Sequence, residues 1–313
     1  MRTLKLVLAY DGTAYAGWQV QPGQPTVQQA LEAAWLQVTG ENVRVAASGR
    51  TDAGVHALGQ VVSVDTDTQI PAESIRSALN ARLPADIAIR FSEEAAPGFH
   101  AIRDAVRKRY RYLLYDGAVR DVFARQYAWH VFGRLDACAM REAAQPLLGT
   151  HDFRSFESNW PNKQTSVRTV FELSVERGTA GQGRGEAAET GREVTDLAQS
   201  TREILPVGHV LPVALSAAAA DDHLITIEIE ADGFLYNMVR AIVGTLVEVG
   251  RGARPIAWPA EALAALDRRA AGPTAPPQGL FLLCVDYDKT DGRAGQGGAA
   301  RTDQNEHNVG NVQ

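Results

Sequence analysis

The sequence predicts an α+β fold built from two similar halves, each with the element order β-α-β-β-α-β. Periodic segments of strand and helix type follow one another in this order twice along the chain. The 313 residues are 45% hydrophobic and 22% charged, enough apolar material for two domains of ordinary size. Two segments, 178–193 and 289–313, are rich in Gly, Ala and polar residues without an apolar period, so we do not expect them in either core.

The first half is expected within residues 1–100. Its opening strand is 3–10, where apolar and polar side chains alternate. Thr26 opens a helix, because Gln29 follows three residues later as in a capping box, and Gly40 ends it. The remaining elements are strands at about 43–48 and 59–65, a helix that opens near Pro71, and a strand at 86–91.

The second half is expected in residues 101–177 and 223–287. Its elements are strands at 108–115, 167–175, 223–231 and 280–287 and helices at 135–147 and 234–249. Each half is then a split β-α-β unit of ferredoxin-like order, and the two halves are expected to meet in a central cleft that holds the site. We expect residues 178–222 to be a low-complexity insertion between two hairpin strands, and 288–313 to be a disordered tail.

Several classes of protein are not supported by the sequence. No apolar run is long enough for a membrane span, and charges interrupt the N-terminal segment too early for a signal peptide, so we expect a cytoplasmic protein. Cys138 and Cys284 stand far apart without a metal-ligand spacing, which predicts two small buried residues and neither disulfide nor metal. Dinucleotide, P-loop and hydrolase motifs are also missing, so these three functions lack support in the sequence.

The formal net charge of −6 does not exclude a polyanionic partner, because acidic residues concentrate in 178–222. Basic and aromatic residues alternate in one strand instead, a composition suited to RNA, where cations meet phosphates and rings stack on bases. A solvated strand edge would have the same composition. The residues of this segment are Arg103, Arg107, Lys108, Arg109 and Arg111, with Tyr110 and Tyr112 between them.

A glycine-rich loop, 47–59, contains the best candidate for a catalytic group. Its glycines bracket Arg50, Asp52 and His56. A carboxylate two residues from an arginine could serve as a nucleophile or general base. The alternative is an ordinary hairpin turn with a turn-forming aspartate. We expect His56 to be a packed or loop residue, because it has no partner at metal-ligand spacing.

Two further residues could reach the same site. In the helix 234–249, Arg240 lies well off the apolar stripe, either on a solvated face or on a face that lines the cleft and pairs with a carboxylate. Tyr110 and Tyr112 share one face of their strand, and Arg109 and Arg111 share the other. One tyrosine is expected in the core, and the other could stack on a nucleobase.

Several segments together resemble the TruA family of tRNA pseudouridine synthases, in that family's order. They cover about residues 1–287 apart from 178–222. The segments are YDGTAYAGWQVQP (10–22), GRTDAGVHALGQV (49–61), LNARLP (79–84), FHAIRDAVRKRYRYLLY (99–115), HDFRSF (151–156), VRTV (167–170), DGFLYNMVRAIVGTLVEVG (232–250) and APPQGLFLLCVDY (275–287).

The resemblance implies a pseudouridine-synthase fold and an enzyme that isomerises uridine to pseudouridine at positions 38, 39 and 40 in the anticodon stem-loop of tRNA. It implies no cofactor and a homodimer with tRNA lying across both subunits. Asp52 matches the essential aspartate, Tyr110 the tyrosine that packs on the target base, Arg240 the arginine that pairs with the aspartate, and Leu280 an apolar residue of the pocket.

The same resemblance suggests how the RNA would be held. Arg50 would enter the space left by a flipped base, and Arg103, Arg107, Lys108 and Arg111 would contact phosphates. Asp52 could add to C6 of the base, attack C1′, or abstract a sugar proton. The alternatives to this enzyme are a tRNA-binding protein without catalysis and a base-excising glycosidase.

Overall fold

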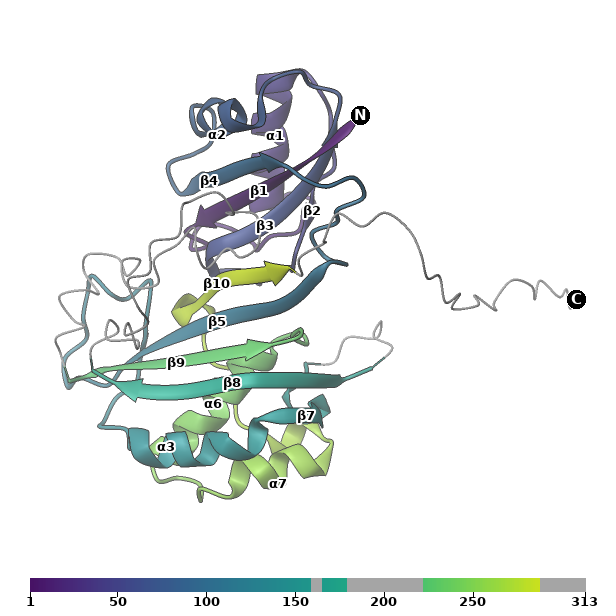
Figure 1. Cartoon of the computed structure of the whole chain (residues 1–313). Helices are drawn as coiled ribbons and strands as arrows, with labels where there is room; N and C mark the ends of the chain where they lie inside the picture. Colours follow the sequence, from purple (N-terminus) through teal and green to yellow (C-terminus); the bar gives the residue numbers. More distant parts are fainter. Residues whose placement is uncertain (159–164, 179–221, 288–313) are drawn as a thin grey trace, which may run out of the picture.

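The computed structural model describes residues 1–158, 165–178 and 222–287, and its strands form one sheet in the order β4-β1-β3-β10-β5-β9-β8-β7 (Figure 1). Two short strands lie off this path, β2 against β3 and β6 against β5. The strands are β1 (Arg2–Tyr10), β2 (Ala46–Ala47), β3 (His56–Thr66), β4 (Ile87–Glu94), β5 (Ala105–Tyr115), β6 (Trp129–His130), β7 (Gly149–Asp152), β8 (Val167–Arg177), β9 (Leu224–Ala231) and β10 (Leu280–Tyr287).

Helices pack against the two ends of this sheet. In Figure 1, α1 and α2 accompany β4, β1 and β3, whereas α3, α6 and α7 accompany β9, β8 and β7. No helix among the described residues is long and apolar enough to cross a membrane. The α-helices are α1 (Val27–Thr39), α2 (Ala72–Asn80), α3 (Ala137–Ala144), α6 (Met238–Gly250) and α7 (Trp258–Ala265), and 3-10 turns occupy Gln145–Leu147, Arg154–Phe156, Arg268–Ala270 and Pro277–Gly279.

Helix α1 shows how local sequence sets an element. The Thr26 side chain accepts a hydrogen bond from the Gln29 backbone N–H at 3.4 Å. At the other end Gly40 has φ 76°, a left-handed conformation that glycine adopts without cost. Leu31 and Trp35 are fully buried against the sheet. The predicted start and end of this helix are therefore confirmed.

Several predicted boundaries were wrong. Strand β3 begins at His56 rather than at residue 59, and β2 is only two residues long, so the connecting loop is 48–55. Helix α6 begins at Met238 rather than at residue 234, because Asn237 is left-handed (φ 62°) and interrupts the helix there. Strands β6 and β7 and helix α7 were not predicted from the sequence. Cys284 is buried as expected, but Cys138 is exposed on α3.

Strand β10 joins the regions that the two predicted halves occupy. It pairs with β5 along most of its length in antiparallel fashion, and with the start of β3 in parallel fashion, Phe281 lying opposite His56. Because β3 begins directly after the loop 48–55, this pairing brings the loop next to the start of β10. The loop, β5 and β10 thus meet at the middle of the sheet.

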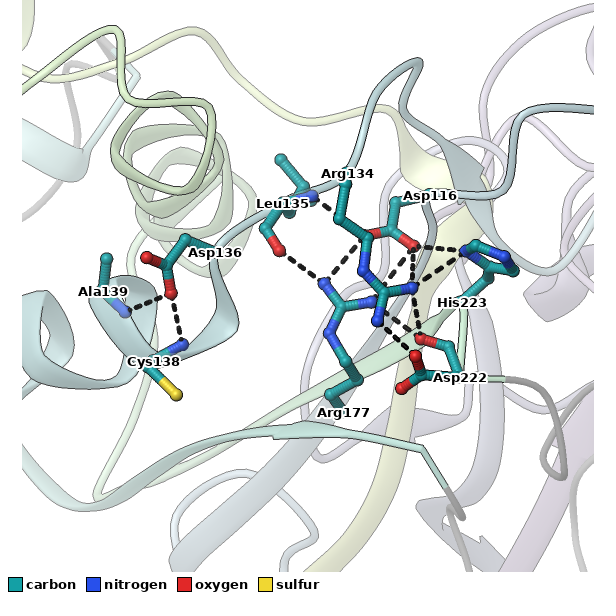
Figure 2. Close-up of polar contacts among 9 residues, drawn as sticks. All are labelled: Asp116, Arg134, Leu135, Asp136, Cys138, Ala139, Arg177, Asp222 and His223. Carbon is teal, nitrogen blue, oxygen red and sulfur yellow. Dashed lines mark hydrogen bonds and ion pairs between the residues drawn. The ribbon is translucent and has the colours of Figure 1, made fainter.

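Buried charge joins the ends of several strands (Figure 2). Asp116, which follows β5, is fully buried and accepts hydrogen bonds from Arg177 Nη2 at 2.8 Å and from the Leu135 N–H at 2.9 Å. His223 Nδ1 lies 3.2 Å from the same carboxylate. Arg134 forms an ion pair with Asp222 and thereby adds the start of β9 to the cluster. Burial alone would raise the pKa of Asp116, but the hydrogen bonds outweigh it and hold the pKa below its ordinary value.

This cluster ties the last residue of β8, Arg177, to the residues just before β9. Those two strand ends flank residues 179–221. The predicted insertion, apart from 178 and 222, and the predicted tail lie outside the described residues.

Candidate active site

The loop 48–55 is held tightly against residues 12–18. The Trp18 N–H donates to the carbonyl of Thr51 at 3.0 Å, and the Gly54 N–H donates to the carbonyl of Tyr15 at 3.3 Å. Gly17 has φ +98°, and a Cβ there would lie 2.7 Å from the Thr51 carbonyl oxygen. Only glycine permits this approach, so the Asp52 backbone is fixed by packing on both sides.

Asp52 forms an ion pair with Arg240. Arg240 Nη1 donates to Asp52 Oδ2 at 3.0 Å, and the two side chains are only 16% and 24% exposed, respectively. A charge-assisted hydrogen bond with this degree of shielding is stronger than one between fully exposed groups. Asp52 Oδ1 makes no hydrogen bond with any described residue, so one carboxylate oxygen stays available to a substrate.

Two further groups fix the Arg240 guanidinium. Arg240 Nη1 also donates to Asn237 Oδ1 at 2.9 Å, and Nε donates to the Ala275 carbonyl at 2.7 Å. Asn237 is in turn anchored through its Nδ2, which donates to Ser158 Oγ at 2.9 Å. The sequence analysis missed Asn237. The available signal was its position one helical turn before Arg240, from which a side chain can reach the arginine.

Tyr110 lies close to this ion pair. Its side chain is buried, and its ring meets Phe234 edge to face, with centroids 5.0 Å apart. Burial raises the pKa of Tyr110 well above its ordinary value, and the nearby Tyr10 and the Asp52 charge raise it further. Tyr110 is therefore neutral at any physiological pH and presents an aromatic surface next to the carboxylate. Phe234 was also missed from the sequence.

The other predicted site residues on the sheet differ in their placement. Leu280, the first residue of β10, is buried and lies opposite Tyr112. Tyr112 is the core tyrosine of the predicted pair, fully buried, with its hydroxyl donating to the Pro276 carbonyl at 2.7 Å. Leu280 therefore belongs to the apolar wall on the Tyr110 side of β5.

Two of the predicted RNA-binding arginines, Arg50 and Arg103, are exposed and form no ion pair with a described residue. Arg50 projects from the loop next to Asp52, and among the described residues it has no ion-pair partner. Arg103 is exposed as well, and its guanidinium donates to the Gly98 carbonyl at 3.2 Å.

Arg107 and Arg111 do not join the site. They lie on the opposite face of β5 from Tyr110, as the alternation of the strand predicts. Arg111 is buried and donates to Glu228 Oε1 at 2.8 Å, and Arg107 donates to Glu230 Oε1 at 3.1 Å. The positive charges of both arginines are therefore already balanced by glutamates. Lys108, in contrast, is on the Tyr110 face and donates to the Ser48 carbonyl at 2.6 Å.

His56 has a structural role in this arrangement. Its Nδ1 accepts a hydrogen bond from the Gly12 N–H at 3.1 Å, and its Nε2 lies 2.9 Å from the Gln126 carbonyl. The ring stacks on Phe281 at a centroid distance of 4.7 Å. The prediction of a packed histidine is thus confirmed. No group of three or more His, Cys, Asp or Glu residues among the described residues could hold a metal.

The site thus combines a partly shielded aspartate, its ion-paired arginine and a buried tyrosine on a mixed α+β fold. A family model described as tRNA pseudouridine synthase matches residues 6–102 and 143–288. The chain therefore belongs to the tRNA pseudouridine synthase family, a family of isomerases.

Individual relatives agree with this assignment. tRNA pseudouridine synthase A of Brevibacillus brevis is 45% identical over 287 residues, which cover 92% of this chain and all of the relative. The protein of the same name from Moorella thermoacetica is 45% identical over 290 residues, again 92% of this chain and all of the relative. The one from Geobacter sulfurreducens is 41% identical over 287 residues, with the same coverage of both chains.

Proposed function

We propose that this protein converts uridine to pseudouridine in tRNA, at positions 38, 39 and 40 of the anticodon stem-loop, with Asp52 as the nucleophile. The observation that carries the proposal is the 3.0 Å ion pair between Asp52 and Arg240, which lie 188 positions apart in the sequence and meet beside Tyr110. The membership of the family supports uridine in tRNA as the substrate.

The reaction breaks the C1′–N1 bond of uridine, turns the detached base, and joins its C5 to C1′; C5 then loses its proton and N1 gains one, so that the product is an isomer of the substrate. Asp52 supports each of three routes: addition of a carboxylate oxygen to C6, attack on C1′, or removal of a sugar proton. Arg240 binds Oδ2 and leaves Oδ1 for this step. In the same proposal it also keeps the carboxylate in one orientation throughout the reaction.

The surrounding side chains have distinct roles in the proposal. Tyr110 holds the uracil ring by stacking while the base is detached, and Leu280 supplies an apolar wall. Because the target base is stacked or paired in the stem, it must leave the helix to reach Asp52. Arg50 is placed to occupy the vacated space, since it is exposed and adjacent to the aspartate.

We also propose that the sheet consists of two ferredoxin-like halves of a pseudouridine-synthase fold, residues 1–100 and residues 101–177 with 223–287, that meet in a central cleft. Support comes from the strand order. The four strands of residues 1–100 lie in the order β4-β1-β3-β2. In the second half, with the short strands β6 and β7 left out, the equivalent order is β10-β5-β9-β8.

The assembly that we propose is a homodimer in the cytoplasm, with tRNA lying across both subunits. Exposed apolar side chains in residues 117–132 support an interface, because a monomer in water gains nothing from exposing them. Light scattering of the purified protein tests the subunit count. A monomer at micromolar concentration would contradict the dimer. These side chains are Val119, Val122, Phe123 and Phe132.

The central experiment is incubation with an unmodified tRNA transcript that carries uridines at positions 38 to 40. Pseudouridine is mapped by carbodiimide treatment and primer extension. We expect stops in this stem-loop with the wild-type protein and none with Asp52→Asn. Asp65→Asn, at an exposed aspartate of β3, is the matched control and should retain activity.

Other outcomes would point to other functions. Full activity of Asp52→Asn would remove Asp52 from the mechanism. Tight tRNA binding without product, in the wild-type protein, would favour a binding protein without catalysis. Released uracil in a nucleoside digest analysed by mass would favour a base-excising glycosidase.

A further inference from the structure

Lys108, beside the loop 48–55, and Arg168, on β8, have no carboxylate partner among the described residues. Lys108 Nζ donates only to the Ser48 carbonyl, at 2.6 Å. Arg168 Nη1 donates to two carbonyl oxygens, those of Thr165 at 3.3 Å and Val167 at 2.6 Å. The neighbouring arginines of β5 all form ion pairs with glutamates. Lys108 and Arg168 differ from them because they lack such a pair with any described residue.

Lys108 belongs to the Tyr110 face of β5. The two side chains are two residues apart on one strand and therefore lie side by side, about 7 Å from each other. The Lys108 amine reaches across to the loop, where a Cβ on Gly49 would lie 3.4 Å from Nζ. Asp52 follows Gly49 by three residues, so this ammonium group stands at the base of the same loop that carries the carboxylate.

Arg168 approaches the same region from β8. Its side chain passes over Gly233, where a Cβ would lie 3.4 Å from Arg168 Nε. The next residue is Phe234, whose ring packs against Tyr110. Lys108 and Arg168 thus flank Tyr110 through different elements of the fold.

Two unneutralised cations this close are unfavourable in the free protein. Burial and, as the smaller cause, the charge of Arg168 together lower the pKa of Lys108 to about 8. A bound anion would remove both penalties, because it supplies the opposite charge that each group lacks. In RNA the recurring anion is the backbone phosphate diester.

We propose that Lys108 and Arg168 together bind one backbone phosphate adjacent to the target uridine. This inference rests on the proposed function and deepens it. The pair would anchor the ribose-phosphate chain while the base is detached and turned, so that C1′ stays opposite Asp52. Both residues are positioning residues, since neither has to touch the base or C1′.

The test is a binding cycle that needs no turnover. Asp52→Asn protein is titrated with tRNA that carries a neutral methylphosphonate linkage on the 5′ or the 3′ side of the target uridine. At one of these two linkages the loss of charge should weaken binding about tenfold, the value of a charged hydrogen bond. With Lys108→Met or Arg168→Met also present, the same linkage should cost at most about twofold.

A second readout separates phosphate binding from a general structural effect. Each lost phosphate contact should lower the slope of log affinity against log salt by about 0.7 to 0.9. Arg107→Met is the matched control, because Arg107 lies on the same strand but on the opposite face. It should keep the full penalty at the critical linkage.

Several results would overturn the proposal. They are an unchanged penalty at both linkages in Lys108→Met and Arg168→Met, or an equal effect of Arg107→Met. If a methionine variant does not fold, Lys108→Gln or Arg168→Gln takes its place, since it removes the same charge, and the penalty should again fall to about twofold or less. If the wild-type protein forms no pseudouridine, the proposed function is refuted but the phosphate proposal is not, because the titrations with modified tRNA measure binding only.

Discussion

The Asn237 side chain should contribute to activity, and its left-handed backbone should be strained. The substitutions Asn237→Gly and Asn237→Ala separate these two effects. Asn237 is left-handed at φ 62°, and its Oδ1 accepts from Arg240 Nη1 at 2.9 Å. Asn237→Gly and Asn237→Ala remove the same hydrogen bonds. Only alanine adds the steric cost of a Cβ at positive φ, roughly 1–2 kcal/mol.

The expected results follow from these contacts. Both variants should lose about tenfold in kcat, because a hydrogen bond to a charged group is worth roughly 1.5–3 kcal/mol and Arg240 would be held less firmly. Asn237→Ala should melt several degrees below Asn237→Gly, since about 1 kcal/mol corresponds to roughly 2–4 °C in a protein of this size class.

The assay is single-turnover pseudouridine formation with saturating enzyme, combined with thermal unfolding followed by circular dichroism. Wild-type rates in Asn237→Gly would show that Asn237 does not position Arg240. Equal melting temperatures of the glycine and alanine variants would refute the argument about backbone strain.

Three further predictions concern packing and charge. In Gly244→Ala a Cβ would lie 1.8 Å from the Pro273 carbonyl oxygen, so the segment that reaches the arginine must shift, and both melting temperature and kcat should fall; an unchanged kcat would contradict this coupling. Gly17→Ala places a Cβ 2.7 Å from the Thr51 carbonyl oxygen at a positive φ, and should lower activity more than tRNA affinity, as gel-shift titration can measure. Asp116→Asn should destabilise the protein by roughly 3–5 kcal/mol at neutral pH in urea titrations, because it removes the buried carboxylate that pairs with the largely buried Arg177. Since the pKa of Asp116 is lowered on folding, its contribution is complete above about pH 4–5 and is lost as the pH falls through the folded pKa, so the stabilities of wild type and variant should converge in acid.

Much of the secondary structure could be predicted because its causes are local. The Thr26 cap and the left-handed Gly40 set the ends of α1 within one turn of the chain. Alternation along β5 correctly placed Tyr110 on one face and Arg111 on the other. The resemblance of several segments then selected Asp52 as the candidate catalytic group.

The faces of β5 illustrate what alternation leaves open. The pattern separates Arg107 and Arg111 from Tyr110, but it does not indicate which face contains the site. Pairing of β5 with β9 adds what the pattern lacks, because it sets Glu228 opposite Arg111 and Glu230 opposite Arg109, on the face away from Tyr110. Lys108 was left without a carboxylate by the same register.

The sequence by itself determined the elements that short-range hydrogen bonds and side-chain periodicity create, and it singled out Asp52 and Arg240 as candidates. The resemblance predicted that these two residues pair, and only the tertiary structure shows how residues 188 positions apart meet. That contact depends on the insertion of β10 between β3 and β5 and on the left-handed turn at Asn237. Long-range pairing of this kind comes from the packing of the whole sheet and leaves no periodic trace in the chain.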